Sequence, residues 1–146
     1  MDREEVLHIL GDIHFFKGFT PEQIDMMVGE EPNISEYRLA DFVVNQGALD
    51  GHFYVLLKGA LYVTKEDLPD FVINKLKPGM VFGEMGILGK KPRYANVIAY
   101  TDATILVIDY ENLPEEIKCT FKSQCIDLLI NRIEEANQQM LKLLVI

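Results

Sequence analysis

The sequence predicts a mainly β domain with helices at both ends. Three features support this: short β-branched and aromatic runs separated by turn residues, a well-marked helix start before them, and a long apolar heptad pattern after them. About eight strands at such close spacing are typical of a β-sandwich, a jelly roll or a barrel. The length of 146 residues suits a single domain.

Residues 1–32 are predicted to be helical. Apolar residues recur at helical spacing within 6–13, which indicates a first helix. A second helix has a clearer start, because Thr20 is a suitable N-cap, a proline follows it, and Gln23 completes a capping box. We expect this helix to end near Gly29, since the proline shortly after it cannot continue a helix.

Residues 33–109 are predicted to form the β part of the domain. The expected strands are Ile34–Leu39, Phe42–Asn45, His52–Lys58, Leu61–Thr64, Phe71–Leu76, Val81–Phe82, Tyr94–Ala99 and Thr104–Ile108. Alternation along the third strand predicts that Phe53, Val55 and Leu57 face inward, whereas His52 and Lys58 face outward.

Residues 110–146 return to a helical pattern. Apolar side chains occupy heptad a and d positions at Ile126, Leu129, Ile133, Ala136, Met140 and Leu143. One interpretation is a long amphipathic helix that lies on its own β part. The other is a helix that pairs with its mate in a parallel dimer. A heptad run of this length favours neither.

Composition excludes several functional classes. Hydrophobic residues make up 49% and charged residues 25%, which supports a packed core. The net charge is −9, with 14 basic and 23 acidic residues, so we expect no nucleic-acid partner. No apolar run approaches the ~18 residues needed to span a bilayer, and no signal segment starts the chain. We therefore expect a cytoplasmic protein without a membrane anchor.

The cysteines and histidines indicate no metal chemistry. Cys119 and Cys125 lie six residues apart, a spacing that matches no metal motif, and we expect buried or half-buried thiols. His8, His14 and His52 are scattered, so the clustered ligands of a metal-dependent β-barrel enzyme are absent. No pairing of a nucleophile with a base is evident either, and we expect a protein that is not an enzyme.

The stretch from Phe82 to Ala95 carries the chemistry. Its glycines let the backbone pass close to another group, and the residues that follow Glu84 are enough for one short helical turn. Arg93 begins a strand whose same-face neighbours are small or apolar, which leaves space beside its guanidinium. A guanidinium binds phosphate in a bidentate way, and a carboxylate accepts a hydrogen bond from a sugar hydroxyl. The pair Glu84 and Arg93 fits a ribose phosphate, or alternatively forms an internal salt bridge that fixes a loop.

This stretch closely resembles the phosphate-binding cassette of the cyclic-nucleotide-binding domains. The matching residues are Phe82, Gly83, Glu84, Met85, Gly86, Pro92, Arg93 and Ala95. The resemblance extends over essentially the whole chain, through Phe15–Gln23, Gln46–Gly59 and Lys77–Gly79. It implies a double-stranded β-helix, or jelly roll, in residues 33–109, with residues 110–146 as a hinge followed by a lid or dimer helix.

The resemblance also implies a role for each matching residue. Glu84 would bind the ribose 2′-hydroxyl, and Arg93 would bind the cyclic phosphate. Backbone N–H groups around Gly86 and Ala95 would complete the anion site. The candidate binding residues are therefore Phe82, Gly83, Glu84, Met85, Gly86, Arg93, Tyr94 and Ala95.

Tyr94 departs from the family pattern, which usually has Ala, Ser or Thr after the arginine. If strand alternation points the ring away from the face of Arg93, the tyrosine is tolerated. If the ring points inward, it narrows the pocket whose apolar side Phe82 and Met85 would line, alters ligand preference or blocks binding. The missing Ser/Thr hydroxyl favours cAMP over cGMP.

The sequence thus predicts a regulatory sensor for a cyclic nucleotide, with cAMP favoured and no metal cofactor. We expect binding to be transmitted by movement of the C-terminal helices. Because the sequence leaves no room for a kinase, channel or DNA-binding segment, we expect the output to be an unidentified protein effector or a homodimer interface. The alternative is a degenerate, non-binding β-roll that acts as a protein-interaction module.

Overall fold

The computed structural model describes residues 1–145, and Ile146 lies outside them. Its helices are α1 Arg3–Gly11, η1 His14–Gly18, α2 Pro21–Val28, α3 Glu84–Gly89, η2 Tyr110–Asn112 and α4 Glu115–Val145. Its strands are β1 Ile34–Tyr37, β2 Phe42–Val44, β3 His52–Lys58, β4 Leu61–Thr64, β5 Asn74–Leu76, β6 Val81–Phe82, β7 Asn96–Ala99 and β8 Ala103–Asp109.

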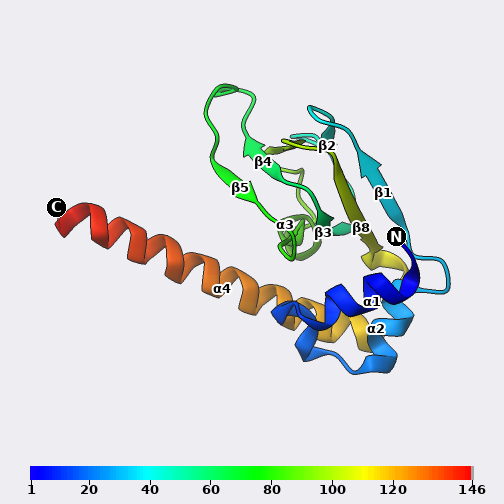
Figure 1. The fold of residues 1–146 in the computed structure, drawn as a ribbon. Coiled ribbons are helices and arrows are strands. Elements are labelled where there is room, and N and C mark those ends of the chain that lie inside the picture. The colour runs from blue at the N-terminus through cyan, green and yellow to red at the C-terminus, as the bar shows by residue number, and fades with distance from the viewer. Residues whose placement is uncertain (146) are drawn as a thin grey trace.

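The strands form two four-stranded antiparallel sheets, ordered β1-β8-β3-β6 and β2-β7-β4-β5. The short helices α1 and α2 pack together at one end of the strands, while α4 runs past them and extends away as a long rod (Figure 1). This is the jelly roll with flanking helices that the sequence predicts, and it carries α3 between β6 and β7.

The N-terminal helices begin and end for the expected local reasons. Thr20 and Gln23 form both hydrogen bonds of the capping box, with N···O distances of 3.1 and 2.9 Å. Gly29 caps the other end of α2 with a φ of 75°. The first helix is shorter than the apolar pattern suggests, because α1 ends at Gly11 and Ile13 is the N-cap of the separate 3-10 turn η1, which begins at His14.

The prediction for β3 is confirmed, whereas the prediction for one of the two cysteines is wrong. Residues 53–57 are all buried, because β3 lies between two apolar clusters. Phe53, Val55 and Leu57 face inward as predicted and pack toward the helices, and Tyr54 and Leu56 on the other face pack into the interior of the roll. The expectation of buried or half-buried thiols is confirmed for Cys125, which is fully buried, and is wrong for Cys119, which is exposed. Alternation finds one face of a strand, but only the arrangement of layers shows that the second face is also covered.

Phe121 joins the three parts of the fold. This residue of α4 is fully buried, with its ring centroid 4.8 Å from that of Phe53 in β3 and 5.1 Å from that of Phe15 in η1. Both contacts are nearly edge-to-face, a favourable geometry for aromatic pairs. The base of α4 is therefore anchored to the roll and to the N-terminal helices at once. No helix within residues 1–145 has the length and apolar character needed to cross a membrane.

We predict that Phe121→Ala lowers the free energy of unfolding by about 3–5 kcal/mol, because it leaves a cavity at this junction. Urea denaturation followed by circular dichroism measures the loss. Phe121→Leu is the matched control and should cost clearly less, since it keeps most of the apolar volume. Equal stability of Phe121→Ala and the unsubstituted protein would contradict the anchoring role.

Candidate functional site

The turn that leads from β6 into α3 places Glu84 inside the protein. Phe82 pairs with Tyr54 across the sheet, and their rings stack with centroids 5.0 Å apart. Gly83 then adopts a left-handed φ of 98°, and a Cβ there would lie 2.9 Å from the carbonyl oxygen of His52. Glu84 opens α3 with only 5% of its surface exposed. A carboxylate this deeply buried requires a partner.

Arg93 is also buried, at 7% exposure. Its guanidinium donates hydrogen bonds to two backbone carbonyls and to the carboxylate of Asp50. Nη1 donates to the Gly83 carbonyl at 2.7 Å, and Nη2 donates to the His52 carbonyl at 2.6 Å. Nη2 also pairs with Asp50 Oδ1, and Nε donates to Asp50 Oδ2 at 3.3 Å. The carboxylate of Asp50 thus faces the Nε–Nη2 edge of the guanidinium, the bidentate geometry in which arginine binds a phosphate.

The loop before β3 holds Arg93 through its backbone as well. The Arg93 N–H donates to the Ala48 carbonyl at 2.8 Å, and its carbonyl accepts from the Gly47 N–H at 2.7 Å. Burial raises the pKa of the Asp50 carboxyl, but the hydrogen bond from Arg93 and the one from the His52 backbone outweigh it, so the net pKa is lowered. Asp50 is therefore an ionised partner of Arg93 at neutral pH.

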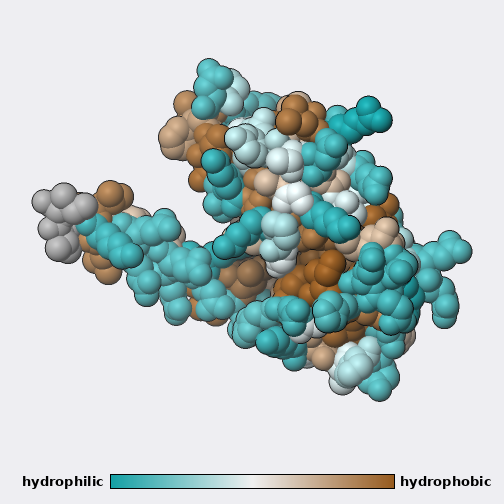
Figure 2. All heavy atoms as spheres, viewed as in Figure 1, coloured by the Kyte–Doolittle hydropathy of each residue, from teal (hydrophilic) through white to brown (hydrophobic). Residues whose placement is uncertain are grey.

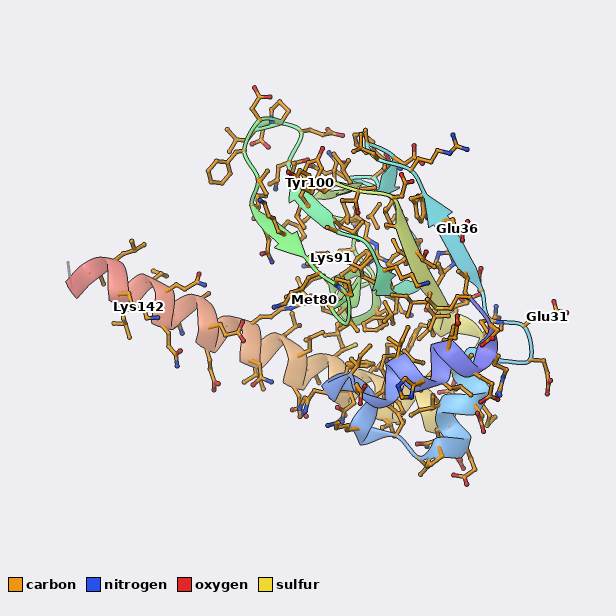
Figure 3. All side chains as sticks on the ribbon, viewed as in Figure 1. Glu31, Glu36, Met80, Lys91, Tyr100 and Lys142 are labelled. Carbon is orange, nitrogen blue, oxygen red and sulfur yellow. The ribbon has the colours of Figure 1, made fainter. Side chains whose placement is uncertain are left out.

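The alternative of an internal Glu84–Arg93 salt bridge is not what the structure shows. Glu84 Oε1 instead pairs with Nη1 of Arg132, which comes from α4. Nη2 of the same arginine donates to the Val81 carbonyl at 2.6 Å. Each buried charge thus has a separate partner of opposite sign. Met80 and Lys91, labelled in Figure 3, bracket the segment that carries Glu84, where it lies beside α4.

Sequence reasoning missed the roles of Asp50 and Arg132. Asp50 lies in the segment Gln46–Gly59, and nothing in its neighbouring residues indicates that it pairs with an arginine 43 positions away. Arg132 did carry a signal: it lies seven residues after Cys125, two helical turns along, and so shares the face of α4 that packs inward. A charged residue on an inward helix face requires a partner in the body of the protein.

The remaining candidate residues divide into two groups. Gly86, Ala95 and Phe82 are buried near the two arginine pairs. Met85 and Tyr94 are 50% and 59% exposed, so their side chains lie away from Glu84 and Arg93. The ring of Tyr94 lies with its centroid 5.5 Å from the Lys65 ammonium, outside the charge cluster. These residues precede β7, which begins at Asn96, and the two neighbours of Tyr94, Arg93 and Ala95, are buried while Tyr94 points outward.

Gly86 is the residue that makes room for Arg93. A Cβ at this position would lie 2.4 Å from Arg93 Nη1 and 2.7 Å from its Cζ, closer than any real Cβ contact. The guanidinium therefore lies directly against the backbone of α3, and a side chain at position 86 must displace it.

Other polar groups do not form a competing site. No group of three or more His, Cys, Asp or Glu side chains able to hold a metal occurs among residues 1–145. A surface hollow between α1 and the turn before β6 includes His8, Asp12, His14 and Lys77 in its lining, but neither Glu84 nor Arg93 borders it.

Comparison with known proteins shows which protein family the chain belongs to. Residues 34–118 match the family model described as "Cyclic nucleotide-binding domain", which covers more than half of the chain. The chain belongs to the cyclic nucleotide-binding domain family.

Individual relatives come from several kinds of regulatory protein. The chain is 33% identical over 113 residues to cyclic nucleotide-gated channel beta-3 of Canis lupus familiaris, covering 75% of this chain and 14% of the channel. It is 28% identical over 127 residues to the cAMP-dependent protein kinase regulatory subunit of Dictyostelium discoideum, covering 82% and 36%. The chain therefore spans well under half the length of these relatives.

A solved structure with a similar fold is the regulatory domain of Toxoplasma gondii PKA in a co-crystal with cAMP. The TM-score is 0.71 at 23% identity, and the match covers 91% of this chain and 50% of that one. At this identity the likeness concerns the fold.

We predict that Gly86→Ala forces the guanidinium of Arg93 out of its position and costs about 1–3 kcal/mol of stability through overpacking. The melting temperature measures this cost. Gly89→Ala in the same helix is the control, because its Cβ would come no closer than 3.4 Å and only to the flexible side chain of Lys91. Equal effects of the two substitutions would show that the close approach at Gly86 is not a constraint.

Proposed function

We propose that this domain binds a cyclic nucleotide between Glu84 and Arg93, with cAMP favoured over cGMP. The observation that carries the proposal is a pair of buried, oppositely charged side chains that do not neutralise each other. A ribose phosphate needs such an arrangement, because its phosphate requires a cation and its hydroxyl a hydrogen-bond acceptor. Backbone N–H groups around Gly86 and Ala95 would complete the anion site.

The pairing of Arg93 with Asp50 suggests how the phosphate enters. Exchanging one oxyanion for another keeps the buried guanidinium paired throughout, so the cost of an unpaired charge is avoided. The bonds from Arg93 to the carbonyls of Gly83 and His52 can hold the side chain in place during this exchange. Asp50 is thus proposed to occupy the phosphate position in the ligand-free protein.

The preference for cAMP rests on the residue after the arginine. Position 94 supplies no Ser or Thr hydroxyl, and the Tyr94 side chain is 59% exposed beside Lys65 rather than close to Arg93. A donor or acceptor often associated with cGMP is therefore lacking on this side of the site.

Transmission is proposed to run through α4. The phosphate draws the segment from Gly83 to Arg93 inward, and α3, at the start of that segment, lies beside α4. The hinge is η2, where the ring of Tyr110 packs against Phe121 with centroids 5.5 Å apart. A ligand moves this equilibrium only if it binds one position of α4 more tightly than the other.

The output surface is proposed to be the outer stripe of α4, defined by Ile126, Ile130, Ile133, Met140 and Leu144. These side chains are 48–79% exposed, and apolar side chains emerge along the lower edge of α4 in Figure 2. At 3.6 residues per turn the stripe faces away from Phe121 and Arg132, which contact the body of the domain. A helix with a second apolar face suits a homodimer, or an effector protein that supplies the matching face.

We predict that cAMP binds in isothermal titration and that Arg93→Ala weakens binding by about tenfold or more, since hydrogen bonds to charged groups are worth about 1.5–3 kcal/mol. Glu84→Ala should weaken binding less. Arg38→Ala, which removes an exposed arginine far along the sequence, is the control and should bind as the unsubstituted protein does. Absence of heat and of competition for both cAMP and cGMP would reject the sensor and favour the protein-interaction module.

We predict a dimer in sedimentation experiments at tens of micromolar protein, and a monomer after Ile133→Asp, because a charge in the outer stripe is desolvated on pairing. Met26→Asp on α2 is the control, since Met26 is equally exposed at 59% but lies outside the stripe. A monomer at this concentration, both with and without cAMP, would rule out self-association through α4.

A further inference from the structure

Arg132 holds the segment from Val81 to Glu84 at both of its ends. One nitrogen of its guanidinium pairs with the Glu84 carboxylate, and the other donates to the Val81 carbonyl at 2.6 Å. Between these two points, the Gly83 carbonyl accepts a hydrogen bond from Arg93. Two arginines from different parts of the chain thus hold one short segment, Arg93 from within the roll and Arg132 from α4.

The ribose hydroxyl is an unsuitable replacement for Arg132. Glu84 is 5% exposed, and a buried carboxylate that loses its only charged partner is strongly destabilised. A hydroxyl is neutral and donates a single hydrogen bond, so it cannot supply the missing charge. The Glu84–Arg132 ion pair therefore has to persist when a nucleotide binds.

The Glu84 carboxylate can bind Arg132 and a ribose hydroxyl at the same time. The bond to Arg132 uses Oε1, and a carboxylate has about four acceptor positions on its two oxygens. Oε2 is free to accept from a ribose hydroxyl while Oε1 keeps the arginine.

We infer that Arg132 is a positioning residue for the ribose: it orients the Glu84 carboxylate and thereby makes ribose binding depend on the docked position of α4. This inference rests on the proposed function. Because α4 and the ribose share one carboxylate, docking of the helix increases affinity for the nucleotide. By linkage, the nucleotide stabilises the docked helix to the same extent.

The test compares two ligands, cAMP and 2′-deoxy-cAMP, which differ only in the hydroxyl that Glu84 binds. Arg132→Ala should weaken cAMP binding by about tenfold and 2′-deoxy-cAMP binding by less than about threefold, because only the former depends on an oriented carboxylate. Arg132→Lys should fall between, since an ammonium lacks the fork that reaches Glu84 and Val81 together. Asn131→Ala, at the exposed neighbouring position, is the control and should leave both affinities unchanged.

The outcomes separate this inference from the proposed function. If the unsubstituted protein binds neither ligand, the proposed function is wrong, and the role of Arg132 is rejected with it. If it binds cAMP but Arg132→Ala weakens both ligands equally, Arg132 stabilises the fold without orienting Glu84, and only the present inference is overturned. Unchanged affinity for cAMP in Arg132→Ala overturns it as well.

Discussion

Two buried charges dominate the organisation of this domain. Glu84 and Arg93 lie inside or against an apolar roll, and each needs a partner of opposite sign because an unpaired buried charge is too costly. The loop before β3 supplies Asp50 to one, and α4 supplies Arg132 to the other. The left-handed turn at Gly83 and the bare backbone at Gly86 leave room for the guanidinium of Arg93 to lie against the segment that carries Glu84. The site thus depends on three segments that are distant in the sequence.

The apolar core holds Glu84 and Arg93 rigidly on the side of β3 and less rigidly on the side of α4. β3 is buried on both faces, with one face toward the helices and the other toward the interior of the roll. Phe121 packs the base of α4 onto this strand. Beyond it, α4 meets the site through the ion pair of Arg132, whose side chain is 38% exposed. Charge pairing at such a half-exposed position is more easily altered than aromatic packing in a core.

The long helix also explains why its sequence pattern supported two interpretations. Its inner face, with Phe121, Cys125 and Arg132, contacts its own domain. The outer stripe that starts at Ile126 faces away from that domain and stays exposed. A heptad pattern indicates an apolar helix, but it does not distinguish the face that contacts the domain from the face that stays exposed. Burial of Cys125, which raises its thiol pKa to about 12, keeps the inner face uncharged there.

Local sequence patterns predicted the short strands, the flanking helices and the capped start of α2. These features depend on alternation and capping, which involve neighbouring residues, whereas the choice of a jelly roll and the roles of Glu84 and Arg93 were implied by resemblance to a family. The packing of the fold was needed to show that Tyr54 and Leu56 are buried and that Tyr94 lies away from the buried charges. It also identified Asp50 as the partner of Arg93 and Arg132 as the partner of Glu84. The physical reason is that a buried charge can be neutralised by any opposite charge within reach, and reach in space is set by how the layers pack rather than by separation along the chain.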